Sequence, residues 1–401
     1  MSVIVDKNCM KMKIRDVENA FRYRRIPYPK RSVELIALIA ISCTFFLFMH
    51  TKNLNTRLRE MEVKLQPSEF SALGLTGEHH ISGGGDGSRS GNDINTLHGT
   101  YQYLKSTGQI EELNAANLNN TAKAEIDILF FNRVPKVGSQ SLMELMKRLT
   151  KINGYITVRD KPREMETILV TEGRAYQIAD EIMELKEPAA YSKHIAYLNF
   201  TQLDFPKPIY INLVRDPIER LASWFYYIRA PWYIADRRKH FPKTVLPAAE
   251  WLEKDFATCL RESDPECVFE QNSIKNLGDH RRQMLFFCGQ DDSVCLPFNS
   301  YHAMQIAKRT VEKEYAVVGS WEDTNITLSV LEKYIPKFFN KALDVYQKSQ
   351  HLLGKVNKNT SRPPVTQEVR DLLSRNMTHE IEFYQFCKQR LYRQYLAVTL
   401  N

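Results

Sequence analysis

The sequence predicts an α/β fold with a central parallel sheet flanked by helices, and three observations predict it. Apolar, strand-forming runs alternate with helix-patterned segments along residues 123–401. Residues 208–214 are almost continuously apolar, which is typical of a strand buried in a parallel sheet. Residues 126–131 form a similar run and lead through a short polar loop into an amphipathic helix. In such a fold, ligands bind outside the carboxyl ends of the strands.

The remaining elements are expected in regular order. Besides 126–131 and 208–214, strands fit 155–158 and 315–319, and a further short apolar stretch covers 194–200. The helix after the first loop places Leu142, Leu145, Met146 and Leu149 on one face. Further helices are expected at 174–186, 217–229, 299–310, 327–337 and 366–396, the last unusually long.

The N-terminal third predicts a membrane anchor followed by a linker. Residues 35–49 are the long apolar run of the chain, and nine Lys or Arg residues precede it. This charge bias predicts a cytosolic tail at 1–32 and a signal-anchor transmembrane helix at 33–50. A cleavable signal peptide is the alternative, but the preceding region is long and no small-residue cleavage site follows. The span is short, as suits the thinner membranes of the early secretory pathway.

Residues 51–122 are interpreted as a lumenal stem. Apolar residues at 54, 58, 61 and 65 fit either a short coiled coil or a solvated single helix. Residues 71–93 are rich in Gly, Ser and other polar residues, which is typical of a flexible linker. The folded domain is expected at 123–401.

Charge distribution argues against nucleic-acid binding. The net charge is +8, but residues 1–31 carry +6 and residues 35–401 only +3. A nucleic-acid site needs its basic excess on the folded domain.

Cysteine spacing and sequons agree with a lumenal domain. Two close pairs, Cys259/Cys267 and Cys288/Cys295, predict local disulfides in an oxidising compartment. A metal site is the alternative, but C-x2-C spacing and histidine partners are missing. Cys387 is left over on a predicted helix and is expected to be buried and free. N-glycosylation sequons begin at Asn119, Asn199, Asn325, Asn359 and Asn376.

The loop at residues 132–141 has the composition of a phosphate site. Lys136, Gly138, Ser139 and Ser141 lie between a strand and a helix, where backbone N–H groups and the helix N-terminus favour an anion. The Gly-x4-Gly-Lys-[Ser/Thr] pattern of nucleoside triphosphatases is absent. A plain strand–turn–helix unit is the alternative.

A second cluster follows strand 208–214. Arg215 ends the strand, Asp216 can cap the next helix, and Pro217 occupies its favoured first position. Parallel strands place Arg215 on the same edge as Lys136, and Ser223 lies two turns into the helix. A local salt bridge with capping is the alternative interpretation.

Together these motifs resemble the Golgi sulfotransferases that sulfate the 2-O position of uronic acids in glycosaminoglycans. The similarity covers residues 126–401 and includes Phe286–Gly289. It implies the donor 3′-phosphoadenosine-5′-phosphosulfate (PAPS) and no metal, in agreement with the absence of a D-x-D motif. By this resemblance, Arg215 and Ser223 bind the 3′-phosphate. The 5′ side would be held by Lys136, Val137, Gly138, Ser139, Gln140 and Ser141.

The resemblance also implies catalytic roles. His194 matches the family's catalytic histidine and would take the acceptor proton, while Lys136 would neutralise the departing oxygen. A structural histidine is the alternative. Some relatives carry a second histidine where this chain has Ser192, which puts a two-histidine scheme in doubt.

Further cations are candidates for contacts with an anionic glycan. Arg133 adjoins the phosphate loop, and Arg237, Arg238 and Lys239 are expected in a loop before the cysteine pairs. A solvated charge run is the alternative for the latter three. By resemblance, the region around Lys355 and Lys358 closes over the donor.

The sequence therefore predicts a Golgi type II membrane sulfotransferase with its catalytic domain in the lumen. Its partners would be a glycan or glycoprotein acceptor and the Golgi membrane, and a homotrimer is compatible with the resemblance. A glycosyltransferase of the same membrane architecture and a non-catalytic glycan-binding relative are the rival interpretations.

Overall fold

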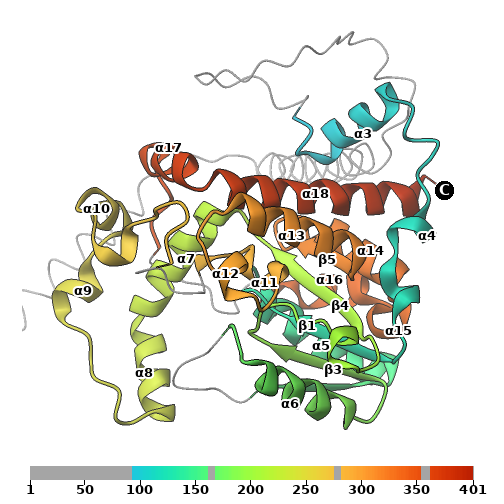
Figure 1. The fold of residues 1–401 in the computed structure, drawn as a ribbon, viewed down its shortest axis with the longest axis horizontal. Helices are drawn as coiled ribbons and strands as arrows, with labels where there is room; N and C mark the ends of the chain where they lie inside the picture. The colour runs from blue at the N-terminus through green and yellow to red at the C-terminus, as the bar shows by residue number, and fades with distance from the viewer. Residues whose placement is uncertain (1–92, 161–167, 275–280, 354–361, 401) are drawn as a thin grey trace, which may run out of the picture. The chain divides into compact units, whose positions relative to one another are not determined.

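A five-stranded parallel sheet forms the centre of the computed structural model (Figure 1). The structure describes residues 93–160, 168–274, 281–353 and 362–400. The predicted tail, the membrane span at 33–50 and residues 51–92 of the stem lie outside them. The strands are arranged in the order β2-β3-β1-β4-β5. Their bounds are β1 Ile128–Asn132, β2 Ile156–Arg159, β3 Ala189–Lys193, β4 Ile209–Val214 and β5 Tyr315–Ser320.

This strand order brings three loops together. Strand β1 pairs with β3 on one side and with β4 on the other. Because all the strands are parallel, the segments that follow β1, β3 and β4 leave the sheet at the same edge. The strand order reverses at β1, with β3 and β2 on one side and β4 and β5 on the other, and open α/β sheets bind ligands at such a point.

The predicted parallel α/β fold is confirmed, and one strand, β3, was not predicted. The expected strands at 126–131, 155–158, 208–214 and 315–319 match β1, β2, β4 and β5 within about two residues. The apolar stretch noted at 194–200 follows β3, which ends at Lys193. Its apolar side chains are buried in a loop, where the Tyr197 N–H donates to the Phe286 carbonyl at 3.0 Å.

Helices cover both faces of the sheet (Figure 1). The longer ones are α3 Leu97–Ser106, α5 Ser139–Asn153, α6 Glu172–Met183, α7 Pro217–Arg229, α8 Pro231–His240, α13 Tyr301–Lys313, α14 Thr324–Tyr334, α16 Ala342–Leu353, α17 Gln367–Asn376 and α18 Thr378–Thr399. The shorter ones are α4 Ala115–Leu118, α9 Ala249–Glu253, α10 Phe256–Arg261, α11 Leu285–Cys288, α12 Asp292–Cys295 and α15 Pro336–Phe339.

The single long helix expected at 366–396 is two helices. Helix α17 ends at Asn376, and Met377 has a non-helical backbone with φ −126° and ψ 29°. The side-chain oxygen of Asn299 accepts from the N–H groups of His379 and Glu380 at 2.8 and 3.0 Å. A distant asparagine therefore caps a new helix start, which the local sequence does not signal.

A buried hydrogen-bonded network lies in the core at the end of β1. All four predicted core positions of α5 are buried. Asn132 is fully buried, and its Nδ2 donates to the Phe286 carbonyl at 2.8 Å. The Tyr315 hydroxyl donates to its Oδ1 at 2.8 Å, and Asn212 Nδ2 donates to its backbone carbonyl at 2.6 Å. One side chain thus joins β1, β4, β5 and α11.

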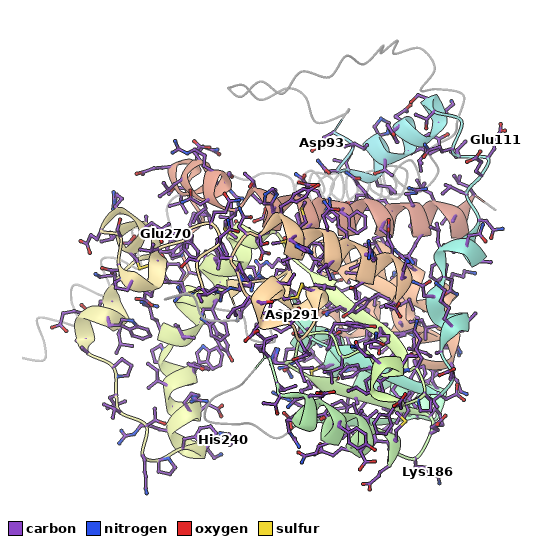
Figure 2. The ribbon with its side chains drawn as sticks, viewed as in Figure 1. Asp93, Glu111, Lys186, His240, Glu270 and Asp291 are labelled. Carbon is purple, nitrogen blue, oxygen red and sulfur yellow. A yellow bond between two sulfur atoms is a disulfide. The ribbon has the colours of Figure 1, made fainter. Side chains whose placement is uncertain are left out.

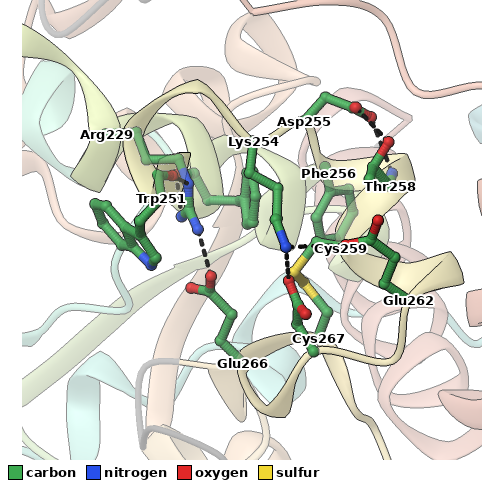
Figure 3. The surroundings of a disulfide bond; sticks show 12 residues. Arg229, Trp251, Lys254, Asp255, Phe256, Thr258, Cys259, Glu262, Glu266 and Cys267 are labelled. Carbon is green, nitrogen blue, oxygen red and sulfur yellow. Dashed lines mark hydrogen bonds and ion pairs between the residues drawn. A yellow bond between two sulfur atoms is a disulfide. The ribbon is translucent and has the colours of Figure 1, made fainter. Parts of the chain in front are cut away.

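Both predicted disulfides are present, Cys259–Cys267 and Cys288–Cys295. Cys387 is buried and free, as predicted. Around the first disulfide, Lys254 donates to Glu262 and Asp264, while Arg229 pairs with Glu266 (Figure 3).

Residues that precede the expected start of the folded domain also pack on it. In helix α3, Tyr101 and Leu104 are buried against Leu396 and Ala397 of α18. This helix lies within the segment assigned to the stem. Among the residues that the structure describes, no helix is long and apolar enough to cross a membrane.

We expect Asn132→Ala to lower the free energy of unfolding by about 1–3 kcal/mol, because it deletes the buried amide that donates to the Phe286 carbonyl and accepts from the Tyr315 hydroxyl. Urea denaturation followed by circular dichroism measures this. Asn340→Ala, at an exposed position after α15, is the control. Equal stability of Asn132→Ala and the wild type would contradict the role assigned to the network.

Candidate active site

A cavity of about 610 Å³ opens at the carboxyl ends of the central strands. It brings together segments that are far apart in the sequence. Its wall is formed by Arg133, Pro135, Lys136, Gly138, Ser139, Gln140, Ser141, Arg159, His194, Arg215, Ser223, Trp224, Tyr227, Trp232, Asp236, Trp321, Leu353 and Arg362. Most of the predicted site residues therefore share one cavity.

The loop after β1 is shaped to present backbone N–H groups. Lys136 and Gly138 both have positive φ, 66° and 87°. Helix α5 begins at Ser139, and no side chain caps its N-terminus. Its first N–H groups are therefore available to an anion. Ser139 and Ser141 line the cavity, whereas Val137 is fully buried in the core and does not.

Gly138 is required where it is, because its neighbour leaves no room for a side chain. An added Cβ would lie 2.6 Å from the Cβ of Trp321 and 2.5 Å from its Cγ. The left-handed backbone at this position disfavours other residues in addition. Trp321 directly follows β5, so the loop after β1 packs against the segment that leaves strand β5.

Positive charge is concentrated beside this loop. The Lys136 ammonium lies 3.6 Å from the centre of the Tyr227 ring. Burial, together with the nearby charges of Arg215 and Arg362, lowers the pKa of Lys136 to about 7. Arg215 donates to the Lys136 carbonyl at 3.2 Å. Glu219 balances the cluster by pairing with Arg362 and lying 3.8 Å from Arg215.

His194 directly follows β3, and Arg133 contacts both of its ring nitrogens. The Arg133 guanidinium donates to Nε2 from Nε at 3.0 Å and lies 2.6 Å away at Nη2. The Arg133 carbonyl lies 2.8 Å from Nδ1. An arginine side chain only donates, so Nε2 accepts and the proton sits on Nδ1. Burial, and next the charge of Arg133, hold the pKa of His194 well below its usual value. The imidazole is therefore neutral.

The loop after β1 and the uncapped N–H groups of α5 together form an anion cradle. A cavity that joins this cradle to buried cations and a neutral histidine suits the transfer of an anionic group. Comparison with known proteins gives the class. A model described as the sulfotransferase family matches residues 121–387. The chain belongs to the sulfotransferase family. The resemblance inferred from its motifs is confirmed, and the protein is a sulfotransferase.

Three relatives illustrate the similarity. The sulfotransferase is 50% identical to the uronyl 2-sulfotransferase homolog pip of Drosophila melanogaster, over 97% of this chain and 94% of that protein. It is 26% identical to human uronyl 2-sulfotransferase, over 65% of this chain and 62% of the relative. It is 30% identical to mouse heparan sulfate 2-O-sulfotransferase 1, over 66% of this chain and 70% of the relative.

The basic run before the disulfides is not in a loop, contrary to expectation. Arg237, Arg238 and Lys239 form the last turn of α8, which Pro231 opens and where the helix dipole favours cations. None of the three lines the cavity; Trp232 and Asp236 of the same helix do. His240, at the end of α8, lies well away from the sheet (Figure 2). Lys355 and Lys358 lie outside the described residues.

Sequence reasoning missed two cations of the cavity wall. Arg159 ends a short strand without a motif, and Arg362 lies near the C-terminal helices as an isolated charge. A weak signal for Arg159 was its place at a strand's carboxyl end, the same signal that identified Arg215.

The sequons differ in accessibility. Asn199, Asn325 and Asn376 are exposed, as glycosylation requires. Asn119 is half-buried, and its amide nitrogen lies 3.4 Å from the Tyr334 carbonyl. Asn359 lies outside the described residues.

One group of possible metal ligands lies outside the cavity. Cys259, Asp264 and Glu266 place ligand atoms within 4.8 Å of one another. Cys259 is in a disulfide, so it offers no thiolate, and both carboxylates pair with cations (Figure 3). The group is an ion-pair network around a disulfide.

We expect Gly138→Ala to lower sulfotransferase activity at least tenfold, because the loop must shift away from Trp321 and so misplaces the N–H groups of α5. Initial rates of sulfate transfer measure this. The control is Gly154→Ala at the other end of α5, where φ is 71° but nothing lies within 4 Å of an added Cβ. It carries similar backbone strain without the clash. Equal activity in the two variants would contradict the prediction.

Proposed function

We propose that this sulfotransferase transfers sulfate from PAPS to a sugar hydroxyl of a glycan, the 2-O position of a uronic acid. The observation that carries the proposal is a single cavity that joins an anion cradle to a neutral histidine with its lone pair on Nε2. The names of the relatives support the position: they are uronyl and heparan sulfate 2-O-sulfotransferases.

The donor would lie along the phosphate loop. Lys136, Gly138, Ser139, Gln140 and Ser141 hold the 5′ side, where uncapped N–H groups and a buried ammonium face the cavity. Arg215 and Ser223 bind the 3′-phosphate, and Arg362 adds a further charge to this end. The proposed scheme contains no metal.

The reaction would be an in-line displacement at sulfur. As the acceptor oxygen forms its bond to sulfur, its proton passes to His194 Nε2, and the bond from sulfur to the 5′-phosphate oxygen breaks. Negative charge develops on that leaving oxygen, beside which Lys136 is placed to neutralise it. Arg133 occupies Nε2 in this structure, so the acceptor hydroxyl takes its place when it binds.

The cellular setting follows from the N-terminal sequence. A signal anchor at residues 33–50 would hold the enzyme as a type II protein in the Golgi membrane, with the catalytic domain in the lumen. Disulfides and exposed sequons suit this compartment. The rival functions fit less well: a glycosyltransferase leaves the Arg215 and Ser223 cluster unexplained, and a non-catalytic glycan binder does not need His194 and Lys136.

We expect His194→Ala to reduce kcat about 10²–10⁴-fold, the usual contribution of a general base. Binding of the product 3′-phosphoadenosine 5′-phosphate, measured as thermal stabilisation, is expected to persist. His302→Ala, an exposed histidine on α13, is the control. Retention of most activity by His194→Ala would disprove the assignment of the base. No stabilisation of the wild type by the nucleotide would disprove the proposed donor.

We also expect the affinity for this nucleotide to fall as pH rises above about 7. Lys136 in the free enzyme has a pKa of about 7, and a bound anion raises it, so binding above that pH requires uptake of a proton. Below pH 7 the ammonium is already charged, and affinity is expected to level off. Isothermal titration calorimetry from pH 6 to 9 measures this. Lys136→Arg, which stays charged, should remove the decline; an unchanged decline would refute it.

A further inference from the structure

Arg159 stands at the carboxyl end of the edge strand β2, beside the proposed base. In the sheet register Arg159 is opposite Ser192, two residues before His194. Strand β3 pairs in turn with β1, where Lys193 is opposite Asn132, one residue before Arg133. Neighbouring strands lie about 4.8 Å apart. Three adjacent strand ends therefore bring Arg159, His194 and Arg133 to one side of the cavity.

The Arg159 guanidinium is the cation of the cavity wall that lacks a partner within the described residues. Arg133 contacts His194, Lys136 lies on Tyr227, and both Arg215 and Arg362 face Glu219. The carboxylate next to Arg159 in sequence, Asp160, pairs instead with Lys193. Arg159 is exposed, lines the cavity, and adds to the positive field at His194.

The cavity also offers aromatic surface. Trp224, Tyr227 and Trp232 line it from α7 and α8, and Trp232 is 42% exposed. Aromatic rings of this kind pack against the C–H face of a sugar. An acceptor sugar thus meets an apolar wall and one unpaired guanidinium, which suits a single anionic group on the ring better than a densely sulfated chain.

We propose that Arg159 binds the carboxylate of the uronic acid whose hydroxyl reaches His194, and thereby selects uronates over neutral sugars. The inference rests on the proposed function and deepens it. A guanidinium matches a carboxylate with two parallel hydrogen bonds. In a uronate the carboxylate and the 2-hydroxyl lie on opposite sides of one ring, so Arg159 and His194 can engage the same sugar at once.

The test compares acceptors that differ only in the carboxylate. Sulfate transfer is measured with desulfated heparin and desulfated dermatan, each also in a carboxyl-reduced form. We expect the wild type to prefer the uronate forms at least tenfold in kcat/KM. Arg159→Gln should lower transfer to the uronate forms much more than transfer to the carboxyl-reduced forms, which removes most of that preference, while affinity for 3′-phosphoadenosine 5′-phosphate matches the wild type. Arg159→Lys, which keeps the positive charge but lacks the two parallel N–H donors of the guanidinium, should retain part of the preference.

The controls separate this role from a general one. Arg261→Gln, at an exposed position on α10, should behave as the wild type with every acceptor. An equal loss by Arg159→Gln on uronate and carboxyl-reduced forms would overturn the proposal. An unchanged preference for the uronate forms in Arg159→Gln would also overturn it. Absence of transfer by the wild type to all acceptors would overturn the proposed function, and the role of Arg159 with it.

Discussion

The site depends first on the buried amide of Asn132. This residue ends β1, the central strand, and its side chain bonds to groups on β5 and α11 while its backbone carbonyl accepts from β4. The next residue along the chain is Arg133, and the phosphate loop follows. The loop therefore starts from a point that is fixed relative to three other elements. A cradle of backbone N–H groups is selective only if it is held in place before the ligand arrives, and Asn132 provides that fixed point.

Electrostatics at the site are arranged for a ligand with several negative charges. Burial, and next the repulsion from Arg215 and Arg362, lowers the pKa of Lys136 to about 7. Glu219 compensates only part of this charge. A bound bisphosphate would relieve the repulsion, so the cost of assembling the cluster is offset when the donor binds. Near His194 it is burial, and next the charge of Arg133, that holds the pKa well below its usual value and leaves the imidazole neutral.

Sequence alone predicted those parts of the molecule in which local pattern and tertiary role agree. Strands β1 and β4 are long apolar runs that end in polar loops. The parallel sheet could therefore be inferred, and so could the position of Lys136 and Arg215 at the same edge of it. Strand β3 reads Ala-Ala-Tyr-Ser-Lys and lacks such a run, while the more apolar loop after it resembles a strand. The break before α18 depends on Asn299, about 80 residues away, which no local signal reveals. Arg159 had only the weak signal of its place at the end of a strand, and Arg362 reaches the cavity through tertiary folding alone.

The position of Arg133 explains how one loop can contact both the base, His194, and the leaving group of the proposed reaction. Its carbonyl fixes the proton of His194 on Nδ1, and its guanidinium occupies Nε2 until an acceptor hydroxyl replaces it. Arg133 is three residues from Lys136, so the contacts to the base and to the leaving group are built on one short segment. In the proposed reaction, an occupied Nε2 also hinders the activation of water when no acceptor is present. A sulfate donor bound in this cavity would then be protected from hydrolysis by the same arginine that orients the base.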